Sequence, residues 1–176
     1  MRLLFDMDRK DYDQCTHQYM RNSSRAIIIR DNKLAMVHSL KYNYFKFPGG
    51  GIEEGETAIE ALIRETMEET GLIIDVNSIK EYGYVHRIQR NDVDESECFV
   101  QNNYYFFCDV EGVVCKTNLD EYEAAEHFTL EYVSPYRIVD TNRNVGETPH
   151  DLLIYEREAK VAELLVKDGI LTRDIE

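Results

Sequence analysis

One segment, residues 47–72, constrains the chain more than any other: FPGGGIEEGETAIEALIRETMEETGL. It opens with a proline and three glycines, which allow a sharp turn and a close approach of the main chain to a ligand. A helix follows, because Thr57 and Glu60 have the spacing of a capping box and Gly71 is a typical residue just beyond a helix end. We therefore predict a glycine-rich loop that leads into a helix ending before Gly71.

The predicted helix has two different faces. At about 100° per residue, one face carries the residues that we expect to be buried: Ile59, Ile63, Thr66, Met67 and Thr70. Glu65, Glu68 and Glu69 gather on the opposite side, where three carboxylates repel one another. A run of charge is usually a solvated helix face, but a hard divalent cation is the simplest partner that makes this cluster favourable.

The spacing of the segment resembles the Nudix box, the signature of the Nudix hydrolases, from Gly50 to Leu72. Five residues separate Gly50 from Glu56, and seven more precede Arg64 and Glu65. Glu68, Glu69 and Gly71 then follow in register with the signature. One position departs from it, because Thr66 stands where the family usually has an aliphatic residue, although Thr can still pack there.

The resemblance implies an α/β (α+β) fold, a Nudix-type α/β/α sandwich with a mixed β-sheet between helices. It also implies that Glu68 and Glu69 bind Mg²⁺ or Mn²⁺ directly, and that Glu65 either ligates as well or acts as the base for an attacking water. The main-chain carbonyl of Gly49 is a further expected ligand, since a glycine lets the backbone approach a metal.

Other box residues are expected to form a framework. By resemblance, Arg64 holds Glu56 through its guanidinium fork and so pins the loop against the helix, while Gly50 and Gly71 have structural roles. Family members often take one more acid from a distant loop. The candidates here are Glu121, Glu123 and Glu126, of which we favour Glu126, with a solvated loop as the alternative for each.

Substrate recognition is less clearly marked. Aromatic rings can stack on a base, and basic side chains can bind a phosphate. The candidates for such contacts are Arg25, Tyr44, Lys46, His86 and Arg87. For each of them the alternative is an ordinary surface or core residue.

The rest of the chain predicts strands around two helices. The expected strands are 25–30, 33–38, 72–74, 81–89, 99–110 and 128–133, with a hairpin turn at Asp31-Asn32. Residues 1–24 are expected to be an edge strand or an irregular N-terminal arm, 111–127 an acidic loop, and Ser134-Pro135 the end of the last strand. A second helix is predicted over 148–168, with Thr148 as N-cap, Pro149 as its first residue and Gly169 just beyond its end. We expect one domain over 1–176.

Composition limits the classes of partner. A net charge of −14 argues against a nucleic-acid polymer, which needs a basic surface. Neither a signal peptide nor a membrane span is visible. The four cysteines lack the spacing of a zinc site or a disulfide scaffold, so we expect a cytoplasmic protein. Many Nudix relatives are dimers, which leaves a homodimer open.

These observations predict a metal-dependent hydrolase that cleaves the diphosphate linkage of a nucleoside diphosphate joined to another moiety, such as a nucleotide sugar, ADP-ribose or a nucleoside triphosphate. Two alternatives remain open at this point. One is a Nudix domain that senses a nucleotide without hydrolysing it, and the other is a hydrolase of a non-nucleotide diphosphate.

Overall fold

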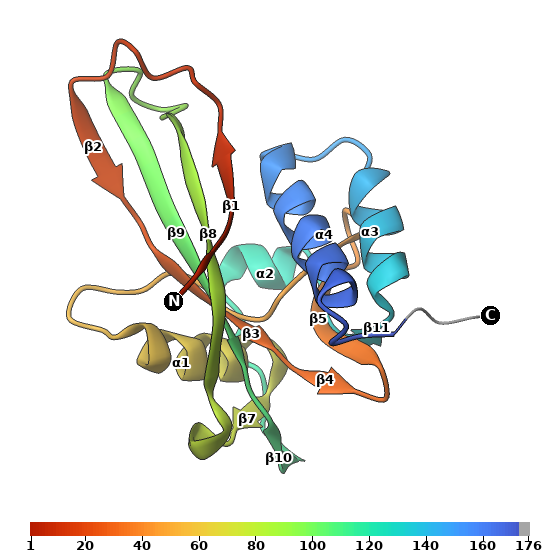
Figure 1. Ribbon diagram of the computed structural model, residues 1–176. Coiled ribbons are helices and arrows are strands. Elements are labelled where there is room, and N and C mark those ends of the chain that lie inside the picture. Colours follow the sequence, from red (N-terminus) through yellow and green to blue (C-terminus); the bar gives the residue numbers. More distant parts are fainter. Residues whose placement is uncertain (173–176) are drawn as a thin grey trace.

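The computed structural model describes residues 1–172, and Figure 1 shows its strands between helices on two sides. The strands are β1 Leu3–Asp8, β2 His17–Met20, β3 Ser23–Ile27, β4 Ile29–Arg30, β5 Lys33–Ser39, β6 Tyr44–Lys46, β7 Leu72–Ile74, β8 Lys80–Arg90, β9 Glu97–Phe107, β10 Val110–Val114 and β11 Phe128–Val133. The helices are α1 Ala58–Thr70, α2 Glu121–Ala125, α3 Pro135–Arg143 and α4 Leu152–Lys167, and Val76–Ser78 forms a short 3₁₀ turn.

The strands form two main sheets that meet where β3 passes into β4. In the larger sheet the order is β1-β8-β9-β2, and β3 also pairs with β9. The β8–β9 pair is antiparallel, whereas β1, β2 and β3 each run parallel to their neighbour, so this sheet is mixed. The second sheet has the order β11-β5-β4, with β6 on β5, and is antiparallel. The mixed sheet between helices confirms the predicted α/β/α architecture.

Two apolar clusters lie on the two sides of these sheets. The first includes Ile27, Phe45 and Tyr105 from the strands with Leu165 of α4. The second packs Leu62 of α1 against residues of β3, β5, β7 and β9. In Figure 1, α1 lies on one side and α3 with α4 on the other. The site described below is built where the strands meet both helical layers.

Several local predictions are confirmed. Thr57 caps α1 in a complete capping box with Glu60, and Gly71 follows the helix in the left-handed conformation. Asp31 and Asn32 both have positive φ, as a tight hairpin turn requires. The strands predicted at 72–74 and 128–133 have those bounds; the one predicted at 33–38 is one residue longer at its end, and the one predicted at 81–89 is one residue longer at each end.

The predicted buried face of α1 is wrong in part. Ile59 and Met67 are exposed by 42% and 41%, whereas Leu62 and Glu69 are almost fully buried. Thr66 is buried as predicted. The face that meets the sheet is therefore rotated from the predicted one. Local periodicity favoured the larger apolar side chains, but Glu69 has a buried cation as its partner, which the helix sequence cannot reveal.

The C-terminal region also differs from the prediction. The last helix begins after Asp151, whose side chain caps Leu153 N at 2.9 Å, and not after Thr148. Thr148 instead pairs its hydroxyl with that of Tyr155 at 2.6 Å. Ser134 and Pro135 do end a strand, but they also begin α3 as its N-cap and first residue. Gly169 has positive φ just beyond α4, as predicted.

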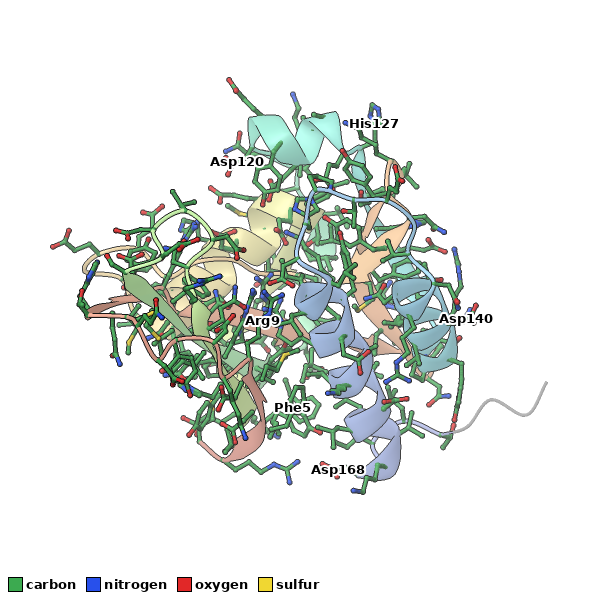
Figure 2. The ribbon with its side chains drawn as sticks, turned by 90° about the horizontal axis from the view of Figure 1, so that it is seen from above. Phe5, Arg9, Asp120, His127, Asp140 and Asp168 are labelled. Atoms are coloured by element: carbon green, nitrogen blue, oxygen red, sulfur yellow. The ribbon has the colours of Figure 1, made fainter. Side chains whose placement is uncertain are left out.

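The N-terminal arm and the acidic loop contain more structure than predicted. Residues 1–24 include β1 and β2, which lie at the two edges of the larger sheet. The strand predicted at 25–30 begins at Ser23 and is divided at Ile28. The strand predicted at 99–110 ends at Phe107, and β10 follows within the predicted loop. Figure 2 shows Asp120 and His127 at the two ends of α2, which lies in the same predicted loop.

Candidate active site

The glycine loop lies in close contact with β3 and α1. At Gly49, where φ is +131°, an added Cβ would stand 2.0 Å from the carbonyl oxygen of Ser24. At Gly50 an added Cβ would stand 2.2 Å from the Glu65 carboxylate. Ser24 N donates to Gly50 O at 2.9 Å, which holds the loop beside the strand. Glycine is therefore needed at Gly49, where the neighbour is backbone and φ is positive, whereas at Gly50 a side chain would displace the Glu65 carboxylate.

Arg64 connects the loop to the carboxylates of α1. Its Nε and Nη2 donate to the two oxygens of Glu56, both at 2.8 Å, which is the framework pair that the resemblance implied. Its Nη1 donates to Glu65 at 2.7 Å and to Glu68 at 3.3 Å. These carboxylates hold the pKa of Arg64 above its ordinary value, chiefly through the Glu56 hydrogen bonds. One guanidinium thus orients three glutamates.

Glu69 is buried, and its hydrogen-bond partners differ from those of Glu65 and Glu68. Its Oε1 accepts a hydrogen bond from Lys46 Nζ at 2.5 Å, and its Oε2 accepts one from Gly49 N at 2.9 Å. Burial raises the pKa of Glu69 to about 7, although Lys46 and Arg25 oppose that change. Both of its oxygens therefore have protein partners in this structure.

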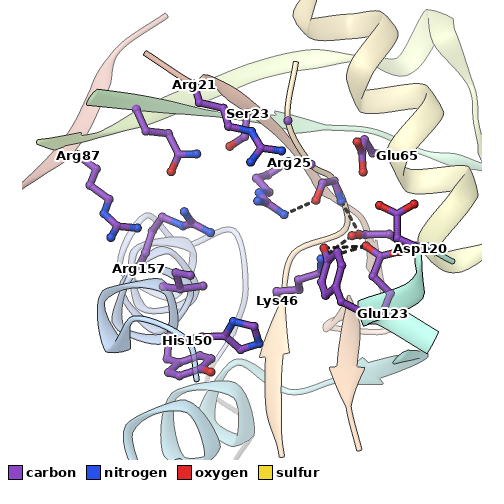
Figure 3. A pocket seen from close by; sticks show the side chains of 18 of the residues that line it. Arg21, Ser23, Arg25, Lys46, Glu65, Arg87, Asp120, Glu123, His150 and Arg157 are labelled. Carbon is purple, nitrogen blue, oxygen red and sulfur yellow. Dashed lines mark hydrogen bonds and ion pairs between the residues drawn. The ribbon is translucent and has the colours of Figure 1, made fainter. Parts of the chain in front are cut away.

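A cavity of about 510 Å³ opens in front of these groups. Its wall combines cations, carboxylates and aromatic rings. Figure 3 shows Glu65, Asp120 and Glu123 on one side of the cavity and Arg87 and Arg157 on the other. Residues of β3, β6, β8, β9, α1, α2 and α4 all contribute to the wall, with others from the loops between them.

The family follows from a comparison with known proteins. A family model described as the NUDIX domain matches residues 20–148 of this chain, which is most of its length. The chain belongs to the Nudix family. The matched range contains the glycine loop, Arg64 and the three glutamates of α1.

Individual relatives of this Nudix chain are more distant or match only part of it. An ADP-ribose pyrophosphatase of Methanocaldococcus jannaschii is 49% identical over 58 residues, which cover 31% of this chain and 34% of that protein. The chain therefore spans about a third of the length of that curated relative.

Solved structures show the same fold. A NUDIX hydrolase from Nitrosomonas europaea has a TM-score of 0.60 and 20% identity, covering 90% of this chain and 96% of that one. A MutT protein from Bacillus halodurans has a TM-score of 0.53 and 18% identity, covering 77% and 80%.

The predicted substrate-binding residues of this Nudix chain divide into two groups. Arg25, Tyr44, Lys46 and Arg87 line the cavity. His86 does not, because it lies on the opposite face of β8 from Arg87, where its Nδ1 is 2.8 Å from Asn102. The hydroxyl of Tyr44 donates to Glu126 at 2.8 Å.

Glu126 lies behind the cavity wall and does not line the cavity. Its Oε2 accepts hydrogen bonds from Ser39 at 2.9 Å and Tyr44 at 2.8 Å, and its Oε1 is 2.5 Å from His150 Nε2. Burial favours the neutral acid, but the hydrogen bonds from His150, Tyr44 and Ser39 outweigh it and lower the pKa of Glu126. Of the three acids considered in this region, Glu123 is the one that lines the cavity, 3.8 Å from Lys46 Nζ.

Sequence reasoning missed other residues of the wall. Arg21, Asp120, His150 and Arg157 all line the cavity. The first two belong to segments that were expected to be irregular, so nothing in them indicated an orientation. His150 and Arg157 lie beyond the range that the family model matches. Only their tertiary position reveals them.

The donor atoms near the glutamates suit a hard cation. Glu65 and Glu68 line a second, adjoining cavity of about 730 Å³ together with Glu53 and Asp120. Within residues 1–172, no three Asp, Glu, His or Cys side chains lie close enough together to bind one metal ion. Arg64 and Lys46 instead form hydrogen bonds with the box glutamates. Carboxylate and carbonyl oxygens are nevertheless the donors that Mg²⁺ and Mn²⁺ prefer, so the residues present fit such an ion.

No described helix is both long and apolar enough to cross a membrane.

Proposed function

We propose that this Nudix chain is a divalent-metal-dependent hydrolase that cleaves the diphosphate linkage of a nucleoside diphosphate joined to a second moiety. The observation that supports this most is the composition of one cavity wall, to which Glu65, the glycine loop, Arg25 and Lys46 all contribute. A diphosphate needs cations to hold its oxygens, and its hydrolysis needs carboxylates beside the phosphorus atom that reacts. Both kinds of group are present within one cavity.

The metal ligands remain part of the proposal. Glu65, Glu68 and Glu69, with the carbonyl of Gly49, would hold Mg²⁺ or Mn²⁺. When bound, such an ion offsets the charge of the phosphate oxygens and lowers the pKa of water. Because Glu69 and the Gly49 carbonyl have protein partners in this structure, Lys46 and Arg25 respectively, Glu65 and Glu68 are the more accessible of the four.

The chain's own residues supply binding and proton transfer. Arg25 and Lys46 hold the diphosphate oxygens. If Glu65 acts as the base instead of as a metal ligand, it accepts a proton from the attacking water at a carboxylate oxygen, and Arg64, at 2.7 Å, orients it for this role. The water oxygen bonds to one phosphorus atom as the bond between that atom and the bridging oxygen breaks. The products are a nucleoside monophosphate and a second fragment that carries a phosphate or, from a nucleoside triphosphate, pyrophosphate.

ADP-ribose is the first compound to test, because the partial relative from Methanocaldococcus jannaschii carries the name ADP-ribose pyrophosphatase. The assay compares ADP-ribose, nucleotide sugars, dinucleoside polyphosphates, and normal and oxidised nucleoside triphosphates, with Mg²⁺ or Mn²⁺, and identifies the products. We expect turnover of one class with release of a nucleoside monophosphate. Absence of turnover on every compound, with tight binding of one nucleotide, would contradict hydrolysis and favour a nucleotide sensor.

A further inference from the structure

Two buried arginines lie at the end of the cavity opposite the glutamates. Arg87, on β8, is 7% exposed, and Arg157, on α4, is 3% exposed. Both line the cavity, and Figure 3 shows them across it from Glu65 and Asp120. In a chain with a net charge of −14, two guanidiniums buried side by side require an explanation.

Each guanidinium is held in a fixed orientation. Arg157 donates to Glu158 through Nε at 2.8 Å and through Nη2, and to Asn103 through Nη1 at 2.8 Å. Arg87 donates to Asp151 through Nη2 and to Gln89 through Nε at 2.9 Å. Positions fixed by buried partners are typical of a binding site that is formed before the ligand arrives.

The direct ion pairs leave the two arginines short of carboxylate partners. Asp151 is shared, because Arg9 also donates to it at 2.7 Å from outside the cavity. Arg9, Arg87 and Arg157 thus form ion pairs with only two carboxylates, Asp151 and Glu158, while Asp92 acts on Arg87 from a greater distance. Burial is the main cause that lowers the pKa of Arg87; Arg157 and Arg9 lower it further, while Asp151 and Asp92 oppose the change.

A purely structural role explains only part of this arrangement. Glu158 also accepts a hydrogen bond from Phe47 N at 3.2 Å, so the Arg157–Glu158 pair connects α4 to the glycine loop. The hydrogen-bond partners of Arg87, Gln89 and Asp151, are not part of the glycine loop. Its guanidinium lies over the ring of Phe99 on the cavity wall, 5.5 Å from the ring centroid. A planar, oriented guanidinium beside an aromatic surface suits recognition of a phosphate.

We infer that Arg87 and Arg157 form a second anion subsite, which binds a phosphate monoester on the substrate that is separate from the scissile diphosphate. The inference rests on the proposed function for the identity of the other end of the cavity. A phosphate monoester carries close to two negative charges near neutral pH, and it can accept hydrogen bonds from guanidinium N–H groups other than those that donate to Glu158, Asn103, Asp151 and Gln89. Arg87 lies within residues 20–148, the range that the family model matches, and Arg157 lies beyond it.

The test compares substrates that differ by one phosphate. NADPH and NADH form one pair, and coenzyme A and its 3′-dephospho form are another. Arg87→Gln should raise KM at least about tenfold for the phosphorylated member of a pair while leaving the other within about twofold. Arg9→Gln is the matched control, because it removes the other partner of Asp151 without touching the cavity. Arg87→Lys, which keeps the charge beside Asp151, should give an intermediate KM if Arg87→Gln folds poorly.

A binding measurement separates this inference from the proposed function. Inorganic phosphate is titrated calorimetrically into the full chain in EDTA. We expect about tenfold weaker binding in Arg87→Gln and wild-type binding in Arg9→Gln. That result without any hydrolysis would keep the subsite and reject the hydrolase. Unchanged phosphate affinity in both Arg87 variants, or an equal rise of KM for both members of each pair, would overturn the subsite even if hydrolysis is confirmed.

Discussion

Lys46 Nζ lies 2.5 Å from Glu69 Oε1, and both side chains are buried at the base of the cavity. A buried ion pair contributes little net stability, but the loss of one partner leaves a desolvated charge behind. Because the pKa of Glu69 is about 7 with Lys46 in place, the penalty applies above that pH: at pH 9, Lys46→Met should lower the free energy of unfolding, measured by urea denaturation, by about 3–5 kcal/mol. Lys33→Met, at an exposed position, is the control. A loss below about 1 kcal/mol would show that Glu69 becomes neutral or finds another partner.

The two neighbouring glycines should respond differently to alanine. At Gly49 the new methyl group would meet the Ser24 backbone, so Gly49→Ala should lower both the melting temperature and activity. At Gly50 the three atoms nearest to it would all belong to the Glu65 carboxylate. Gly50→Ala should keep the melting temperature near the wild-type value but reduce kcat on the order of 100-fold, because Glu65 is displaced. Full activity in Gly50→Ala would contradict a catalytic position for Glu65.

The Glu56–Arg64 pair should make stability depend on acidity. The hydrogen bonds from Arg64 lower the pKa of Glu56 below its ordinary value of 4.5, although partial burial opposes them. A lowered pKa in the folded state adds stability above the unfolded pKa, and that stability is lost as pH falls through the folded value. The difference in unfolding free energy between wild type and Glu56→Gln should therefore shrink between about pH 6 and pH 3. A constant difference would contradict the pair.

Thr66 offers a stabilising substitution. Its side chain is fully buried, and its Oγ1 has no hydrogen-bond partner within residues 1–172. Thr66→Val should therefore raise the free energy of unfolding by about 1 kcal/mol, because an unsatisfied hydroxyl is replaced by a methyl group of similar size. Thr70→Val is the matched control and should destabilise, since the Thr70 hydroxyl donates to Thr66 O at 2.5 Å. The same sign of effect in both variants would refute this explanation.

Local signals in the sequence predicted the parts of the fold that are determined locally. The capping box at Thr57, the stop at Gly71 and the turn at Asp31 depend on neighbouring residues, and all three are confirmed. The start of α4 was mispredicted because Thr148 and Asp151 are both good caps. The choice between them depends on tertiary contacts, since Asp151 also binds Arg9 and Arg87.

The site was predictable from the box and, in part, from the candidate substrate-binding residues, since Arg25, Tyr44, Lys46 and Arg87 line the cavity. The spacing of Glu65 and Glu68 placed both on one helix, and both line cavities. Glu69 differs, because its buried partner Lys46 comes from a strand 23 residues earlier. Arg157 reaches the cavity only because α4 packs back onto the sheets, and a single sequence carries no signal for that long-range contact.

The most direct measurement is the Mg²⁺-dependent hydrolysis rate of ADP-ribose, or of the best compound from the substrate comparison, for wild type, Glu68→Gln and Glu54→Gln. Glu54 is an exposed carboxylate of the same segment and serves as the matched control. We predict wild-type turnover in Glu54→Gln, loss on the order of 100-fold or more in Glu68→Gln with an unchanged melting temperature, and no turnover in EDTA. Turnover of folded Glu68→Gln within a few-fold of wild type, or turnover that persists in EDTA, would contradict the proposed metal-dependent role of the box glutamates.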